Sequence, residues 1–582
     1  MDERAIDYDY IIVGGGSAGC VLANRLSANA ENRVLLLESG VDTPPGAVPA
    51  DILETFPKAA LIPLYKWMKL FAHTNSLASP LGQKLNPILY DQARVMGGGS
   101  SVNHQAANRG SPDDYDEWRD LGASGWGWKD VLPYFRKLET DANFDGPLHG
   151  KSGPLPITRM PRDQWCGFSE GVVKAAEQAG LREIADQNAE WTDGWFPAAM
   201  NNQPTHRVSA AMAYLDAATR RRPNLRIVSR AHVQEILFDG RRAVGVRVPM
   251  DGSVKELRSR EVILSLGAVH SPAMLMRAGI GPGSDLQALG IPVIQDLPGV
   301  GRNLRDHPGI PVLAYLMPEA RVPMEERPLQ VSYRYSSGVE GCPPGDIYAA
   351  VFCRSGWHPV GWRIGGIMTW VNKSFSTGRV SLRDTDWDAE PKVELNLCED
   401  PRDIQRLIAA VRFAASLYES EPLKKVAEQP FPAAFTPRMR AAMAVNAKNA
   451  LAMTVMGWLL DGPAPLRRWL LKEVITQRAD LKAMLANEAG LEKFVRSTTN
   501  GIKHLSCTCR MGRADDPLAV TDTEGRVHGV EGLRVIDAST MPSLPRANTN
   551  LATLMLAEKL SDAILGIVPA RSEPEAEALI RA

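Results

Sequence analysis

The sequence predicts an α/β protein, mixed α+β overall, in which a Rossmann-like dinucleotide-binding domain is joined to a second domain built on an antiparallel sheet flanked by helices. Three observations lead to this prediction: a glycine-rich strand–turn–helix–strand pattern at 11–38, alternating strand patterns at 225–247 and 364–396, and a return to strand and helix at 533–567. A chain of 582 residues is too long for one hydrophobic core, so two or more domains are expected.

The first pattern is typical of a dinucleotide site. An apolar run is followed by Gly14, Gly16 and Gly19 in G-x-G-x-x-G spacing, then by a helical stretch and a second apolar run that ends in Glu38. The first glycine permits a sharp turn, the second lets a pyrophosphate approach the backbone, and the third lets the helix pack close to the strand. The helix N-terminus favours phosphate, and the acid can accept hydrogen bonds from ribose hydroxyls. A glycine-rich turn in an ordinary βαβ unit is the alternative.

Composition excludes several classes of protein. Hydrophobic residues make up 44% of the chain and charged residues 23%, which is ordinary for a globular protein. The net charge of −1 argues against a bulk electrostatic binder of nucleic acid. The seven cysteines are scattered, and only Cys507 and Cys509 lie close together. We therefore expect no metal site and a reducing, cytoplasmic compartment.

No targeting or membrane segment is visible. The first ten residues are acidic and lead directly into the first strand. No apolar run reaches the ~18 residues needed to span a bilayer. The nearest, 441–460, is interrupted by Asn446, Lys448 and Asn449, which predicts a buried or interfacial helix and no transmembrane segment. Residues 568–582 are polar and contain proline, so we expect a flexible tail.

The other elements follow in chain order. Residues 90–110 form a glycine- and serine-rich loop, and 225–247 alternate as strands around a hairpin turn at Asp239-Gly240. Residues 261–266 form a buried strand that leads into a helix opening at Gly267, with Pro272 near its first turn. Residues 364–396 predict a separate antiparallel sheet, and 401–495 are mostly helical in pattern.

Strand–helix patterns at both ends predict that the C-terminal segment folds back to complete the N-terminal sheet. The dinucleotide-binding domain is then discontinuous and consists of residues 1–155, 216–310 and 500–567. Residues 156–215 and 311–499 form the substrate-binding domain.

A second cluster carries candidate catalytic groups. It begins at Lys503 as KHLSCTCRMG, and ANTN follows at 547–550. A histidine suits proton transfer near neutral pH because its unperturbed pKa is about 6.5, and an amide donates to and accepts from an oxygen without titrating. His504 and Asn548 beside a cofactor would suit removal of a hydroxyl proton while a hydride leaves the carbon. Taken alone, the spacing is more typical of a structural histidine.

With these motifs in order, the chain resembles the glucose–methanol–choline (GMC) family of FAD-dependent oxidoreductases over roughly residues 8–567. The segments that carry the resemblance are GGGSAG with Glu38, RVMGGGSSVN and NRG at 94–110, GAVHSPAMLMRAGIG at 267–281, GVGRNLRDHP at 299–308, HLSCTCRMG at 504–512, and LRVIDASTMP with NTN at 533–550. Within the family, GGGSSVN, NRGSPDDYDEW, GRADD and ANTNL are most similar to the bacterial 5-hydroxymethylfurfural oxidases and to aryl- or allylic-alcohol oxidases.

The resemblance implies a role for each segment. His504 stands at the family's catalytic histidine and Asn548 at the second His or Asn that faces flavin N5. The implied reaction is removal of the alcohol proton by His504 with hydride transfer to N5. The substrate-pocket candidates are Ile502, Lys503, His504 and Asn548. The residues implied to bind FAD are Gly14, Gly16, Ser17, Ala18, Gly19, Glu38, Ser39, Arg94, Gly98, Ser101, Val102, Asn103, Val233, Asp537, Ala538, Asn548 and Thr549.

Several positions depart from the family pattern. Val102 stands where some relatives carry a histidine bonded to FAD, so we expect non-covalent FAD. Leu505 and Cys507 replace the usual Pro and Gly. Lys503 replaces a Trp, and it either lies near the flavin or points to solvent.

Other residues have less defined roles. His307, in the RDHP segment, is interpreted as structural, and His104 either approaches the site or is structural. The methionines of 432–475 either line a substrate entry or pack in a core or subunit interface.

The resemblance therefore predicts an enzyme that oxidises a primary alcohol, aromatic or allylic, to the aldehyde and reduces O2 to hydrogen peroxide. Two alternatives stay open: an alcohol dehydrogenase that passes electrons to a quinone or another acceptor, and, from a different class, a hydroxynitrile lyase on the same fold. The expected partners are a small-molecule alcohol and O2 or another electron acceptor, without nucleic acid, and a homodimer stays open.

Overall fold

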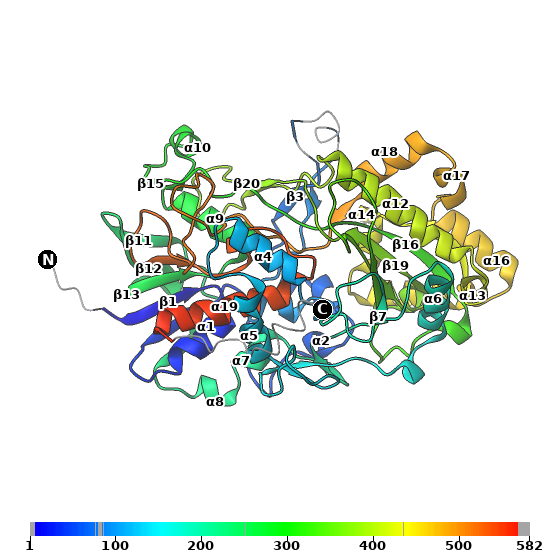
Figure 1. Ribbon diagram of the computed structural model, residues 1–582, viewed down its shortest axis with the longest axis horizontal. Helices are drawn as coiled ribbons and strands as arrows, with labels where there is room; N and C mark the ends of the chain where they lie inside the picture. Colours follow the sequence, from blue (N-terminus) through cyan, green and yellow to red (C-terminus); the bar gives the residue numbers. More distant parts are fainter. Residues whose placement is uncertain are drawn as a thin grey trace.

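Two seven-stranded sheets organise the protein (Figure 1), whose computed structural model describes residues 6–75, 77, 78, 84, 86–250, 252–434 and 436–567. The predicted tail, 568–582, lies outside the described residues. The first sheet has the order β10 (Leu225–Val228), β2 (Val34–Leu37), β1 (Tyr8–Val13), β13 (Ser253–Leu264), β12 (Arg242–Met250), β11 (Glu235–Asp239), and β24 (Leu533–Val535) also pairs with β13.

The long strand β13 joins two kinds of pairing. Its first half forms an antiparallel hairpin with β12, and its second half lies parallel between β1 and β24. The predicted return of the C-terminal segment to the N-terminal sheet is therefore confirmed. The helices α1 (Ser17–Ser27) and α19 (Thr549–Leu565) run beside each other along this sheet (Figure 1). Arg25 of α1 reaches Asp562 of α19 at 2.8 Å, which ties the two ends of the chain together.

The second sheet is antiparallel throughout. Its order is β22 (Ala427–Pro432), β16 (Pro308–Leu316), β19 (Ile364–Val371), β18 (Ile347–Phe352), β17 (Leu329–Tyr335), β7 (Gly194–Pro197), with β23 (Asn500–Gly501) also on β16. The helices α12 (Pro401–Tyr418) and α6 (Gly167–Gln178) pack against it. Because β16 begins at Pro308 and β23 begins at Asn500, the proposed domain limits at 310 and 500 cut into this sheet.

The prediction for residues 364–396 needs correction. Residues 364–396 do not form one separate sheet: β19 joins the large antiparallel sheet, whereas β20 (Arg379–Ser381) and β21 (Lys392–Glu394) form a four-stranded sheet with β3 (Phe71–His73) and β4 (Ile88–Leu89). Alternation reveals a strand but not its partner. The predicted helix after the buried strand is α9 (Gly267–Arg277), with Pro272 in its second turn, and within the mostly helical region 401–495 the chain also forms the short strand β22.

The apolar stretch 441–460 lies at the surface. It spans α14 (Pro437–Met443) and α15 (Ala447–Leu460), and α16 (Ala464–Trp469) follows. Trp458 is 69% exposed, so of the two predicted alternatives the buried helix is excluded and the interfacial helix stays a prediction. Met453 and Met456 pack, partly buried, against the cluster that holds Leu460. Among the described residues, no helix is both long and apolar enough to cross a membrane.

The remaining elements are short or peripheral. They are α2 (Ala50–Leu53), α4 (Pro112–Asp120), α5 (Trp128–Leu138), α7 (Ala210–Tyr214), α8 (Ala217–Arg220), α10 (Gly283–Ala288), α11 (Pro359–Trp362), α13 (Glu421–Lys424), α17 (Leu481–Leu485), α18 (Glu488–Thr498), β5 (Glu139–Asp141), β6 (Leu155–Ile157), β8 (Asn202–Gln203), β9 (His206–Arg207), β14 (Ile280–Gly281) and β15 (Gln295–Asp296).

Candidate active site

The turn between β1 and α1 forms an open cradle. Gly14 has φ +105°, and a Cβ there would lie 2.5 Å from the Ser265 carbonyl oxygen. A Cβ on Gly19 would collide with the Gly14 carbonyl, which shows how closely helix and strand pack. At Gly16 the nearest atom to an added Cβ is 3.8 Å away. The protein's own packing therefore requires glycine at the first and third positions, whereas the space at Gly16 fits a group from outside the chain.

Two helix N-termini meet at this cradle. The N-caps of α1 and α19, Gly16 and Asn548, make no side-chain capping bond, so the first N–H groups of both helices lack partners within their own helix. The Ser17 hydroxyl donates to Asn550 Oδ1 at 2.9 Å and holds the two termini together. Asn548 Oδ1 and Asn550 Nδ2 are buried without a partner in the described structure. Uncapped N–H groups and orphaned amide atoms fit a large polar, anionic cofactor such as FAD.

Glu38 ties two turns together at the end of β2. Its Oε2 accepts from the Gly15 N–H at 2.8 Å and its Oε1 from the Gly40 N–H at 2.7 Å. Burial raises the pKa of Glu38, while the two backbone hydrogen bonds oppose that rise. The Ser39 hydroxyl lies 3.5 Å from the same carboxylate.

The loop at 97–103 lies against the glycine turn. Gly97 N–H donates to the Gly15 carbonyl at 2.7 Å, and a Cβ on Gly98 would lie 2.8 Å from Gly16 Cα. The Ser101 hydroxyl donates to a backbone carbonyl within the loop, and Asn103 Oδ1 accepts from a buried arginine at 2.8 Å. The structure thus brings this loop and the cradle together.

The remaining FAD candidates surround the same region. Asp537 caps the start of α9, because its Oδ2 accepts from the Gly267 N–H at 2.9 Å and the Ser271 hydroxyl at 2.6 Å. The Ala538 carbonyl accepts from the backbone N–H of Cys507, which links this segment to the loop that carries His504. Among the others, Val102 and Val233 are buried, Arg94 lies over the Trp67 ring, and Thr549 opens α19.

Asp306 holds two histidines by their backbones. Its Oδ1 accepts from the N–H of His307 and from the N–H of His504, each at 2.8 Å. Burial raises the pKa of Asp306 to about 6, although these backbone hydrogen bonds oppose the rise. The carboxylate therefore fixes the start of β16 and the catalytic loop relative to each other.

The two imidazole rings form a chain whose proton positions follow from its end. His307 Nε2 lies 3.1 Å from the Pro545 carbonyl, which can only accept, so this nitrogen carries the proton. Burial lowers the pKa of His307 to about 3, so the ring is neutral and its Nδ1 is an acceptor. His504 Nδ1, 2.8 Å away, must then carry a proton. Burial, with smaller contributions from neighbouring histidines, lowers the pKa of His504 well below its usual value. His504 Nε2 is therefore an unprotonated base.

Asn548 faces that base. Its Nδ2 lies 2.9 Å from His504 Nε2, and its backbone N–H donates to Asn108 Oδ1 at 3.2 Å. The structure thus brings the two predicted catalytic candidates together. The interpretation of His307 as merely structural is incomplete, because its ring contacts His504 directly. The RDHP segment, which contains His307, was the signal available in the sequence. The hydrogen bond that sets the His307 tautomer goes to a main-chain carbonyl, which leaves no mark in the sequence.

The structure also gives the contacts of the other pocket candidates, Lys503 and Ile502, and of His104. Lys503 does not extend into solvent: its Nζ lies 4.5 Å from the centre of the Tyr90 ring, and burial lowers its pKa. Ile502 packs, partly buried, against an apolar cluster with Phe352. The His104 ring contacts Phe352 at 4.9 Å between centroids. Cys507 has φ +74°, a conformation that favours glycine and accounts for the glycine common in the family at this position.

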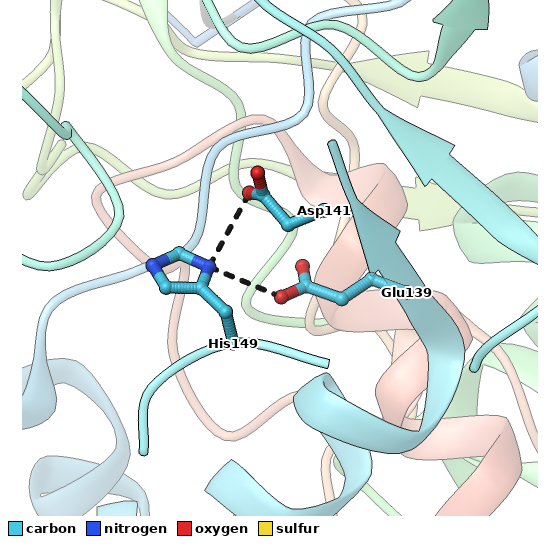
Figure 2. A group of neighbouring side chains, drawn as sticks. All are labelled: Glu139, Asp141 and His149. Carbon is cyan, nitrogen blue, oxygen red and sulfur yellow. Dashed lines mark hydrogen bonds and ion pairs between the residues drawn. The ribbon is translucent and has the colours of Figure 1, made fainter. Parts of the chain in front are cut away.

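A buried cluster of charged side chains is linked to the site through the segment that contains Asn108 and Arg109. His149 Nδ1 lies 3.3 Å from both Glu139 Oε1 and Asp141 Oδ2 (Figure 2), and its Nε2 lies 2.8 Å from Asp186 Oδ2. Burial alone would lower the pKa of His149, but hydrogen bonds to the three carboxylates raise it to about 10. The ring is therefore charged at neutral pH.

Two arginines balance the remaining charge of this cluster. Arg109 pairs with Glu139, and Arg159 contacts Asp186 at 2.7 Å. Three cations thus face three carboxylates, which disfavours a metal ion although the side chains have suitable types. The backbone N–H of Arg109 donates to Asn188 Oδ1 at 2.9 Å. The cluster thereby anchors the segment whose Asn108 supports Asn548.

The fold and this site define the class of protein: a dinucleotide-dependent oxidoreductase with a histidine–asparagine pair beside its cofactor cradle. Models of the GMC oxidoreductase family match residues 8–309 and 374–557. The chain belongs to the GMC oxidoreductase family and is an FAD-dependent alcohol oxidoreductase. The predicted Rossmann-type α/β fold is confirmed.

Individual relatives cover nearly the whole chain. It is 44% identical to 5-(hydroxymethyl)furfural oxidase of Methylovorus sp. (strain MP688) over 96% of this chain and 98% of that protein. It is 33% identical to oxygen-dependent choline dehydrogenase of Stenotrophomonas maltophilia (strain K279a) over 97% of this chain and 96% of that protein. The crystal structure of pyridoxine 4-oxidase from Mesorbium loti superposes with a TM-score of 0.79 and 26% identity, covering 96% of this chain and 99% of that one.

Proposed function

We propose that the enzyme oxidises a primary alcohol, aromatic or allylic, to the aldehyde and uses O2 as electron acceptor, with hydrogen peroxide as the second product. FAD, when bound, supplies the acceptor for the hydride that leaves the alcohol carbon. One observation carries the proposal: the neutral His504 turns an unprotonated Nε2 toward the Asn548 amide, beside the cofactor cradle.

His504 acts as the general base. Its Nε2 accepts the hydroxyl proton of the alcohol, while its Nδ1–H stays bonded to His307 and keeps the ring in place. Without substrate, Asn548 Nδ2 donates toward His504 Nε2. When an alcohol binds between the two side chains, the same Nδ2 can donate to the substrate oxygen. A positioned base of this kind contributes about 10²–10⁴-fold to the rate.

An apolar cluster that includes Ile502, two residues before His504, supports the proposed substrate class. Phe352, Met368 and Ile502 pack, partly buried, against the cluster that contains Trp370. Apolar side chains this close to the proposed base favour a flat apolar alcohol over a charged one. The 44% identity to a furfural oxidase points in the same direction.

Three further parts belong to this proposal. FAD is held without a covalent bond, because valine at 102 offers no nucleophile. The compartment is reducing and cytoplasmic, in keeping with seven free cysteines. The domain division given above stands as proposed, with β16 and β23 shared across its limits.

Oxygen uptake with candidate alcohols tests the function. We expect oxygen consumption with stoichiometric peroxide, and no stimulation by an artificial acceptor. Flavin reduction that turns over only with an artificial acceptor would instead identify a dehydrogenase, as the name of the choline dehydrogenase relative suggests. A flavin absorption band that never bleaches under anaerobic conditions with any alcohol would favour the lyase. Flavin left in the supernatant after acid precipitation is expected from non-covalent binding.

A further inference from the structure

Two cysteines meet outside the candidate active site. Cys166 is the N-cap residue of α6, and Cys353 directly follows β18. Both thiols are free. The Ser169 hydroxyl lies 3.6 Å from Cys166 Sγ and 3.1 Å from Cys353 Sγ, and Cys353 Sγ also lies 3.6 Å from Gln330 Oε1. The fold therefore brings two sulfur atoms from distant parts of the chain to the same hydroxyl group.

Gln330 of β17 fixes this arrangement. Its Oε1 accepts from the backbone N–H of Cys166 at 3.0 Å and from the Ser169 hydroxyl at 2.7 Å. Because the hydroxyl gives its only proton to the amide, its oxygen can only accept from a thiol. The pair is thus held by α6, β17 and the end of β18 together.

The surroundings of Cys166 favour its thiolate. Cys166 stands at the start of a 12-residue helix, whose N-terminus carries partial positive charge. The neighbouring Cys353 thiol lowers the pKa of Cys166 most, and together with the nearby backbone N–H groups and the Ser169 hydroxyl it outweighs burial and brings the value to about 7. Burial raises the pKa of Cys353 well above its usual value, so this residue stays a thiol.

The two cysteine residues also differ in solvent exposure, and the more exposed one is the one with the lower pKa. Cys166 is 8% exposed, whereas Cys353 is completely buried. A small oxidant therefore meets the thiolate first, and the buried thiol is already in position behind it.

We propose that Cys166 and Cys353 form a peroxide-responsive pair that closes to a disulfide. The Cys166 thiolate attacks one oxygen of hydrogen peroxide, the O–O bond breaks, and a sulfenic acid forms as hydroxide leaves. The Cys353 sulfur, on losing its proton, attacks the Cys166 sulfur and expels the sulfenic oxygen as water. Two thiols are oxidised while one peroxide is reduced to two waters. Only the internal source of that peroxide rests on the proposed function.

The first experiment adds hydrogen peroxide to the resting holoenzyme and follows each cysteine by alkylation and mass spectrometry. We expect a peptide that links Cys166 to Cys353, a loss of two hydrogen atoms, and reversal by dithiothreitol. The Cys166 thiol should disappear at least ~10-fold faster than that of Cys342, which is more exposed but has a raised pKa.

Matched variants separate the steps. Cys353→Ser should stop the reaction at a sulfenic acid on Cys166 that dimedone traps. Cys166→Ser keeps a good N-cap side chain and should leave Cys353 reduced. Cys342→Ser is the control and should leave the linkage unchanged. A wild-type protein that ends with sulfinic acid on Cys166, or with both thiols free after Cys342 is oxidised, would overturn the proposal.

The second experiment replaces added peroxide by turnover with alcohol and O2, with and without catalase. Disulfide formation that catalase suppresses supports both the pair and the oxidase. If added peroxide closes the disulfide but turnover does not, the oxidase assignment fails while the pair stands. If added peroxide leaves the two cysteines unlinked, the pair itself is wrong.

Discussion

His307 Nδ1 lies 2.8 Å from His504 Nδ1, so the proton between the two rings decides which nitrogen of His504 is free to act. The Pro545 carbonyl at the other side of His307 settles that choice. A backbone carbonyl therefore sets, through one ring, the tautomer of the next. Proton position at the reactive nitrogen follows from a main-chain atom, which side-chain substitution at 545 leaves in place.

Removal of His504 tests the assignment of the base. His504→Ala should lower the rate of anaerobic flavin reduction by about 10²–10⁴-fold, because the proposed acceptor of the hydroxyl proton is lost. Asn548→Ala should cost less, since it loses one hydrogen bond to the substrate oxygen. Stopped-flow flavin reduction measures both effects. Near-normal reduction in the His504 variant with every good substrate would show that the base lies elsewhere.

Replacement of His307 tests the tautomer relay. His307→Ala leaves the Nδ1–H of His504 without its acceptor, so the wrong tautomer becomes populated, and we expect kcat to fall by about 10–100-fold with little change in KM. His528→Ala, which removes a histidine bonded to the Gly512 carbonyl, is the matched control. Equal effects in the two variants would indicate general destabilisation and no relay.

The pH profile reports the buried histidine. His504 acts as a base only when its ring is neutral. Burial is the main cause that lowers the pKa of His504 well below its usual value. Activity is therefore present above that low pKa and is lost as pH falls through it. We expect kcat/KM to stay level from neutral pH to below 6.5. Asp306, whose pKa burial raises to about 6, is the other titrating group, and Asp306→Asn identifies any limb that belongs to it. An acid limb above 6.5 that persists in this variant would contradict the neutral base.

Substitution in the glycine turn separates cofactor binding from folding. Gly16→Ala meets no atom closer than 3.8 Å, so the thermal stability of the apoprotein should change by less than about 0.5 kcal/mol. FAD affinity should fall at least ~10-fold, because the methyl group occupies the cradle. Gly19→Ala is the contrast, since its Cβ collides with the Gly14 carbonyl and should prevent folding. Unchanged FAD affinity in the Gly16 variant would refute the cradle.

The cluster around His149 predicts a pH-dependent stability. Its pKa rises from about 6.5 in the unfolded chain to about 10 in the fold, so its contribution is complete below pH 6.5 and is lost as pH rises toward 10. His149→Gln leaves the carboxylates one charge in excess and should cost about 3–5 kcal/mol at neutral pH. Melting temperatures between pH 6.5 and 10 measure the difference between the two proteins. A difference that does not shrink with pH would mean that the ring is not charged.

Sequence patterns predicted the parts of the fold that rest on local rules. The first βαβ unit, the hairpin at Gly240 and the final strand–helix pair all have turn chemistry or periodicity that is visible in the chain. The partners of β19 and β20 were not predictable, because alternation does not encode which edge a strand joins. For α15 the sequence left a buried and an interfacial helix open for a similar reason, since apolar composition does not show what covers a helix.

The candidate site likewise has features that the sequence shows and features that it does not. The family resemblance identified His504 and Asn548. It did not identify the residues that hold these two side chains in place. Asp306 holds its partners by backbone N–H groups, and Asn108 accepts from another. Hydrogen bonds to the main chain carry no signature of the residue that donates, so only coordinates reveal them. Lys503 shows the reverse case, in which an unusual residue is visible but its contact with an aromatic ring is not.

The pairing of β24 with β13, and of α19 with α1, has a consequence for biosynthesis. Helix α1 and strand β13 cannot meet α19 and β24 until the end of the chain has been made, whereas strands β16 to β19 can pair as soon as they emerge from the ribosome. Nascent protein therefore holds an unfinished cradle until translation is nearly over, and flavin can be captured only by a chain that has been synthesised almost to its end.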